Sequence, residues 1–225
     1  MRFTNIFFTI LFLFPFFNHA QKNFSTLGES SLSINHNVSQ NYGMNIALRS
    51  RYILYSDFDV QYLQQQVDFL HFSSLKLSYN HRLSLGFLYR NRDWFQRGSD
   101  EFRLTEQFNY TKQKLGVRYG HRIRFEQRFF KTSTVYRQRY RFAVDFPLNG
   151  EKLDIGETYL ISAVESLLSL SDLYQPETDL RLTAQIGWQL SQALKLQTGL
   201  EHRLEAFNLE TFNTLFVLTS AVIKI

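Results

Sequence analysis

The sequence of 225 residues contains no cysteine, so no disulfide can hold the fold together. It also lacks the spacings of Rossmann, P-loop and zinc-finger motifs and the G-x-S-x-G of α/β-hydrolases. No set of His, Asp and Glu residues has metal-ligand spacing, and we expect no metal or other cofactor. The net charge of +5 is too small to indicate a nucleic-acid partner.

Long apolar runs are also missing beyond the first twenty residues. The apolar stretch Thr211–Ile223 is shorter than the ~20 residues that a transmembrane helix needs. An exported chain without such a helix is either soluble or a β-barrel. A closed barrel is the one helix-free fold that pairs every backbone group in lipid.

The N-terminus has the organisation of a secretory signal peptide. Arg2 is followed by the apolar stretch Ile6–Phe17, which is too short to span a bilayer. Cleavage after Ala20 is expected although Asn18 occupies the −3 position, and the alternative is an uncleaved anchor. We therefore predict a signal peptide over residues 1–20.

Strict alternation of charged and apolar residues marks the segment Tyr119–Phe146, and this period of two is typical of β-strands. Ile123, Phe125 and Phe142 stand on the apolar parity. The charged parity carries Arg118, Arg122, Arg124, Glu126, Arg128, Arg137, Arg139, Arg141 and Asp145. A sheet with one apolar and one charged face suits a membrane barrel with lipid outside and a polar lumen inside.

The rest of the chain predicts an all-β, antiparallel, up-and-down transmembrane barrel. Counting from Met44 gives about ten strands, and an even number is usual for such barrels. Residues 21–43 are a periplasmic lead-in or a weak first strand, and residues 44–225 form the barrel. Twelve strands is the alternative, if Leu32–Val38 is counted and residues 58–79 are split. A bulge or an extra turn near Gln64–Gln66 or Ser73–Ser74 is expected to reset the alternation there.

The two arginine runs should pair as a hairpin with a turn at Phe130–Val135. Arg128 would then oppose Arg137, Glu126 would oppose Arg139, and Arg124 would oppose Arg141. Buried guanidinium groups need partners, and the carboxylates expected in the same lumen are Glu101, Glu126, Asp145, Glu201 and Glu205. This charge ladder is either a rigid structural filling or a track for acidic solutes.

Histidines offer little support for an enzyme. His36, His71, His81, His121 and His202 are scattered, and none lies in a recognisable hydrolase context. We expect no enzymatic activity, and a rim-active lipid hydrolase is the alternative.

Several segments resemble a known family. The runs HRIRFEQRFF (His121–Phe130) and YRQRYRFAVDFPLNG (Tyr136–Gly150) are similar to the central signature of domain of unknown function 2490, an uncharacterised outer-membrane barrel family of Bacteroidetes-type bacteria. Segments similar to its flanking motifs are Glu101–Gln107, Gly156–Leu160 and Asp179–Trp188. The resemblance covers most of Met44–Ile223. It implies an outer-membrane barrel and names no substrate.

Together these observations predict a monomeric barrel in the outer membrane of a Gram-negative bacterium. Its role is structural, or it is a narrow passage with an arginine-rich lumen. An accessory barrel of an envelope complex is a further alternative. The expected partners are outer-membrane lipid, acidic solutes, and lipopolysaccharide phosphates near Arg49, Arg51 and Arg90–Arg97.

Overall fold

The computed structural model describes residues 24–92 and 100–225. The expected signal peptide lies outside the described residues. So do residues 93–99, which include most of the Arg90–Arg97 segment expected to contact lipopolysaccharide phosphates. Within the described ranges, no helix is long and apolar enough to cross a membrane.

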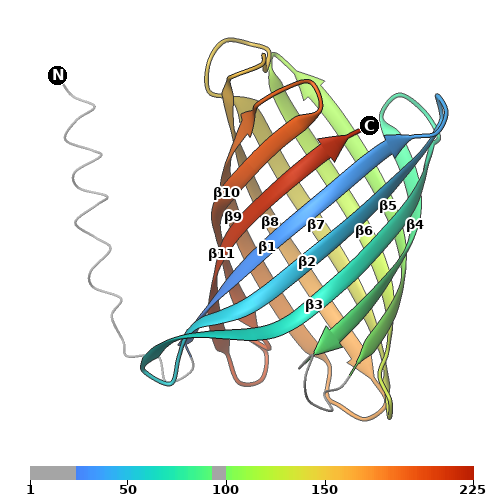
Figure 1. The fold of residues 1–225 in the computed structure, drawn as a ribbon. Coiled ribbons are helices and arrows are strands. Elements are labelled where there is room, and N and C mark those ends of the chain that lie inside the picture. The colour runs from blue at the N-terminus through green and yellow to red at the C-terminus, as the bar shows by residue number, and fades with distance from the viewer. Residues whose placement is uncertain (1–23, 93–99) are drawn as a thin grey trace.

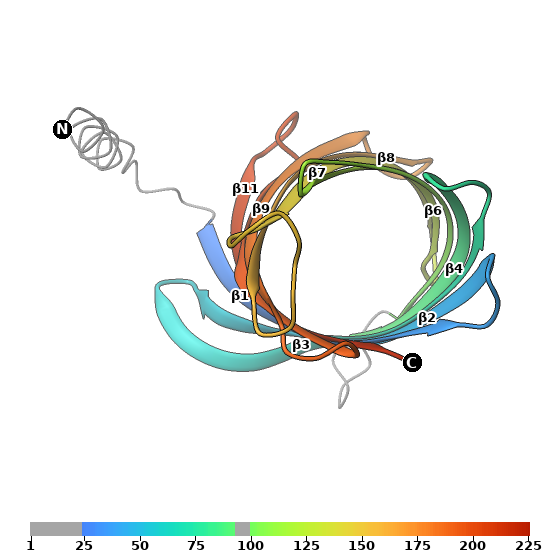
Figure 2. The same cartoon turned by 90° about the horizontal axis from the view of Figure 1, so that it is seen from above.

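Eleven strands form a closed barrel, so the expected all-β barrel is confirmed (Figures 1 and 2). Each strand pairs antiparallel with the next, and β1 pairs parallel with β11 to close the ring. The strands are β1 Phe24–Asn37, β2 Tyr42–Ser56, β3 Asp59–Lys76, β4 His81–Arg92, β5 Glu101–Lys114, β6 Val117–Phe129, β7 Thr134–Pro147, β8 Thr158–Ser171, β9 Glu177–Gln189, β10 Leu194–Glu205 and β11 Phe212–Lys224.

The count of eleven differs from the ten, or alternatively twelve, strands expected from the sequence. Two features account for the difference. Residues 24–37 form a full strand that pairs with both β2 and β11, and most of residues 58–79 form the single strand β3. Because the count is odd, β1 and β11 run in the same direction. The two ends of the described chain therefore lie at opposite ends of the barrel, called here the N-end, where β1 begins, and the C-end, where β11 ends (Figure 1).

A bulge in β3 explains why the alternation changes there. Arg51 of β2 pairs with Gln66, but Tyr52 pairs with Gln64, so Gln65 has no partner in the β2 ladder. The extra residue shifts the side-chain parity. The reset expected near Gln64–Gln66 is confirmed.

The arginine hairpin is formed by β6 and β7, but its predicted register is wrong by two residues. Arg128 opposes Val135, Glu126 opposes Arg137, and Arg124 opposes Arg139. The reason is a tighter connection than expected, in which the Phe130 N–H donates to the Ser133 carbonyl oxygen at 2.9 Å. A shift of two residues preserves the parity, so the charged side chains still share one face.

The outer face of the barrel is strongly apolar. Phe125 is 51% exposed and Leu85 is 60% exposed, and both stand on the parity opposite the charges. Near the C-end a row of rings crosses β4 to β7 on this face, in which His121 contacts Tyr110, Tyr140 and Phe142. The sheet therefore turns its aromatic and aliphatic side chains outward.

Candidate functional site

The barrel encloses a cavity of about 1030 Å³. Among the described residues that line it, fifteen are arginines and five are glutamates. Neutral hydroxyl and amide side chains make up much of the remaining wall. The interior is therefore polar, and its lining carries more positive than negative side chains.

The structure brings the charged parity of β6 and β7 together on this wall. Arg118, Arg122, Arg124, Glu126, Arg128, Arg137, Arg139 and Arg141 line the cavity. The ninth expected residue, Asp145, accepts a 2.6 Å hydrogen bond from Arg118. No group of three or more His, Cys, Asp or Glu in the described ranges is placed to hold a metal ion.

Glu101 is the most heavily engaged carboxylate on the N-end side of the cavity. Its side chain is 0% exposed, and its oxygens lie 2.6 Å from Arg103 and 2.7 Å from Arg128. Arg90 and Arg92 lie 3.5 and 3.4 Å away. One buried carboxylate thus offsets part of the charge of several guanidinium groups, as buried ions require.

Ion pairs of this kind continue from strand to strand without a break from β1 to β8. The series, which we call the ion belt, consists of Glu29, Arg49, Asp68, Arg90, Glu101, Arg103, Glu126, Arg139 and Glu165. Its closest contacts join Arg103 to Glu101 and Arg139 to Glu165, both at 2.6 Å, and its longest joins Arg49 to Asp68 at 4.0 Å. Eight neighbouring strands are therefore linked through their side chains as well as their backbones.

An aromatic residue connects the strands on the other side of the barrel. Phe216 of β11 is 1% exposed. The guanidinium of Arg203 lies 3.6 Å from its ring centroid, and that of Arg51 lies 4.8 Å away. Cations over an aromatic face are attracted by the ring quadrupole. This contact joins β10, β11 and β2.

Sequence reasoning named some of the carboxylates in this interior and missed others. Glu101 and Glu126 belong to the ion belt, whereas Glu201 pairs separately with Arg203 at 2.6 Å. The missed members are Glu29, Asp68 and Glu165. The change of parity at the β3 bulge hid Asp68, and Glu165 was overlooked although the period of two along β8 could have identified it.

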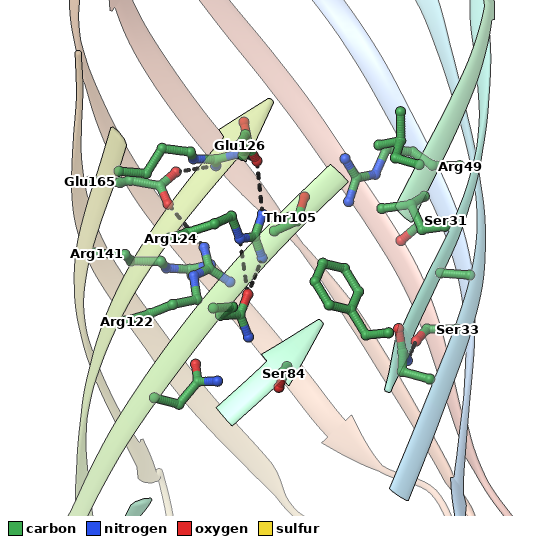
Figure 3. Close-up of a pocket in the computed structure, with 18 of the residues that line it drawn as sticks. Ser31, Ser33, Arg49, Ser84, Thr105, Arg122, Arg124, Glu126, Arg141 and Glu165 are labelled. Atoms are coloured by element: carbon green, nitrogen blue, oxygen red, sulfur yellow. Dashed lines mark hydrogen bonds and ion pairs between the residues drawn. The ribbon is translucent and has the colours of Figure 1, made fainter. Parts of the chain in front are cut away.

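On the C-end side of the ion belt, three arginines converge with few carboxylates near them (Figure 3). Arg122 and Arg141 are directly opposed on β6 and β7, and Arg124 follows on the same face of β6. Arg124 donates to the amide oxygen of Gln107 at 2.9 Å. Arg122 donates to Glu165 at 2.9 Å, a carboxylate that it shares with Arg139.

A serine and a histidine meet on the outer face of β3. His71 Nε2 and Ser73 Oγ lie within hydrogen-bond distance at 3.1 Å, and Tyr42 Oη lies 3.1 Å from the same serine oxygen. Their ladder neighbours on β4 are the apolar residues Phe87 and Leu85. The spacing His-x-Ser on a strand places both side chains on one face, and this signal was available in the sequence.

Comparison with protein families identifies the chain. A family model described as a protein of unknown function (DUF2490) matches residues 30–210. The chain belongs to this family. The match extends from β1 to the connection after β10 and includes the whole β6–β7 hairpin. No curated protein matches this DUF2490 chain.

Proposed function

We propose that this DUF2490 barrel lies in the outer membrane of a Gram-negative bacterium and has a structural, non-enzymatic role. The observation that carries the proposal is the ion belt. It crosses eight strands inside a barrel whose outer wall is apolar.

The outer face supports insertion in lipid. Large apolar side chains are exposed on nearly every strand, and few monomeric soluble proteins expose contiguous apolar surface on this scale. A membrane barrel has this polarity because its lipid-facing residues alternate with lumen-facing polar ones. The row of rings around His121 fits an interfacial aromatic girdle.

The ion belt favours a braced interior over an open pore. Asp68 and Glu101 are 0% exposed and Glu126 is 2% exposed, so little water reaches their side chains. An ion that crosses the lumen would have to break several of these ion pairs at once. Paired side chains are therefore poor binding sites for a passing ion. We therefore propose that the belt stiffens the barrel and obstructs free ion flow.

Two measurements test this proposal. The protein should fractionate with the outer membrane and migrate faster on a gel before boiling than after it. Purified protein in planar bilayers should show no steady ohmic conductance. Recovery in the soluble periplasm would contradict the location, and a stable open-channel current would contradict the braced interior.

A second candidate, a lipid hydrolase, is favoured by the Ser73–His71 pair. His71 would accept the Ser73 hydroxyl proton as Ser73 attacks an ester carbonyl, and would return it to the leaving alcohol. Water would then release the fatty acid and free the serine. The apolar neighbours Leu85 and Phe87 would place this chemistry against acyl chains.

Covalent labelling with a fluorophosphonate distinguishes the two candidates. A hydrolase would be labelled at Ser73 and would release fatty acid from phospholipid vesicles. Both signals would vanish in Ser73→Ala and persist in Ser84→Ala, since Ser84 lies in the cavity and bonds Ser74. A structural barrel shows neither signal in any variant.

A further inference from the structure

We propose that the C-end side of the cavity binds the phosphate group of a hydroxyl-rich solute, with Arg122, Arg124 and Arg141 as its ligands. This site goes beyond a structural role. It rests on how these three arginines differ from those of the ion belt.

Arg141 carries a charge that the described residues leave without a hydrogen bond or ion pair. It stands directly opposite Arg122 on β6 and opposite Glu165 on β8, but the Glu165 carboxylate is held by Arg122 and Arg139. Like charges at directly opposed positions of a sheet are destabilising. A bound anion between them would convert this repulsion into attraction.

Arg122 and Arg124 are only partly satisfied. Arg122 shares Glu165 with Arg139, and its buried Nε has no hydrogen-bond partner. Arg124 bonds a neutral amide at 2.9 Å, while its nearest carboxylate, that of Glu126, lies 3.5 Å away and is also held by Arg103 and Arg139. The guanidinium groups of Arg122, Arg124 and Arg141 therefore converge without a full share of carboxylate partners (Figure 3).

The donors of this cluster select the ligand class. Guanidinium groups present planar forks of N–H donors, which match the oxygens of phosphate and offset its charge. Across the cavity the wall carries neutral hydroxyl and amide groups, including Ser31, Ser33, Asn45 and Ser84. These side chains donate and accept hydrogen bonds, so they suit the hydroxyls of a sugar better than an apolar tail.

Access to the cluster is available from the C-end. A second cavity of about 630 Å³ lies there and shares Lys76, Arg82 and Arg118 with the main cavity. Lys195 and Lys224 also line it. A mouth lined by one sign of charge concentrates ions of the opposite sign and raises their rate of arrival.

Isothermal titration of the detergent-purified full-length protein tests the site with three probes: glucose 6-phosphate, inorganic phosphate and glucose. At constant ionic strength we expect glucose 6-phosphate to bind more tightly than phosphate, and glucose not to bind. Arg141→Gln should weaken glucose 6-phosphate binding at least tenfold. The matched control is Arg137→Gln, because Arg137 is on the same face of β7 and donates to Ser169 on the N-end side.

Thermal unfolding separates loss of the site from loss of the fold. Without ligand, Arg141→Gln should unfold at the same temperature as the native sequence or higher, because among the described residues Arg141 has no ion pair to lose and its removal relieves repulsion from Arg122. The proposal is overturned if neither phosphate compound binds, if both bind equally well, or if Arg141→Gln binds glucose 6-phosphate as tightly as Arg137→Gln does.

Discussion

Single carboxylates inside the barrel each serve several arginines, so their removal should be costly. Glu126 contacts Arg103, Arg124 and Arg139. Glu126→Gln would leave these buried cations undercompensated, and we expect it to lower the free energy of unfolding by about 3 kcal/mol. Unfolding of the vesicle-embedded protein by the denaturant guanidinium chloride, followed by tryptophan fluorescence, measures this loss of stability.

Glu205 supplies the matched comparison for that experiment. It also lines the cavity, but the side chain that donates a hydrogen bond to it is the neutral hydroxyl of Thr214, at 3.3 Å. Glu205→Gln should therefore change stability far less than Glu126→Gln. Equal losses in the two variants would show that the ion belt is not what stabilises the interior.

Within a strand, the two faces should respond oppositely to added charge. Phe125 points outward from β6, whereas Ser33 of β1 lines the cavity. Phe125→Lys should destabilise the barrel by about 2–4 kcal/mol if the site lies near the bilayer midplane. Ser33→Lys should be tolerated much better, and similar losses at both positions would mean that the outer wall does not face lipid.

The strands themselves were largely predictable, because alternation of side chains follows directly from strand geometry. The change of phase at Gln64–Gln66 was also visible, since a bulge adds one residue to the count. What the sequence did not show was the length of the turn at Phe130–Ser133, and the hairpin register depends on that length. The pairing of each arginine with its carboxylate depends in turn on the register.

Strand β1 was the hardest element to recognise. Its many serine and asparagine residues weaken the apolar parity, although Leu32 is 43% exposed on the outer face. Its status as a full strand becomes clear only from its two neighbours, β2 and β11. That long-range pairing gives the barrel its odd strand count.

For the molecule as a whole, the start of β1 and the end of β11 lie at opposite ends of the barrel (Figure 1), and in the proposed membrane-spanning barrel these two ends face opposite sides of the membrane. Epitopes inserted after Tyr174, at the N-end, and after Gln192, at the C-end, should therefore differ in exposure. On intact cells an antibody should label one insertion and not the other, and permeabilised cells should show both. Labelling of both in intact cells would contradict a membrane-spanning barrel.

The parallel seam between β1 and β11 also affects the order in which the strands pair during folding. The contact between Ser25 and Thr214 joins residues 189 positions apart, whereas every other pair of strands is adjacent in the chain. Loop closure costs entropy before any contact offsets it, and distant pairings form slowly. Neighbouring hairpins should therefore assemble first and the seam last. Until the seam closes, β1 and β11 expose unpaired edges that can pair with other chains. Fast closure, or a chaperone that covers these edges, would protect the nascent barrel from aggregation.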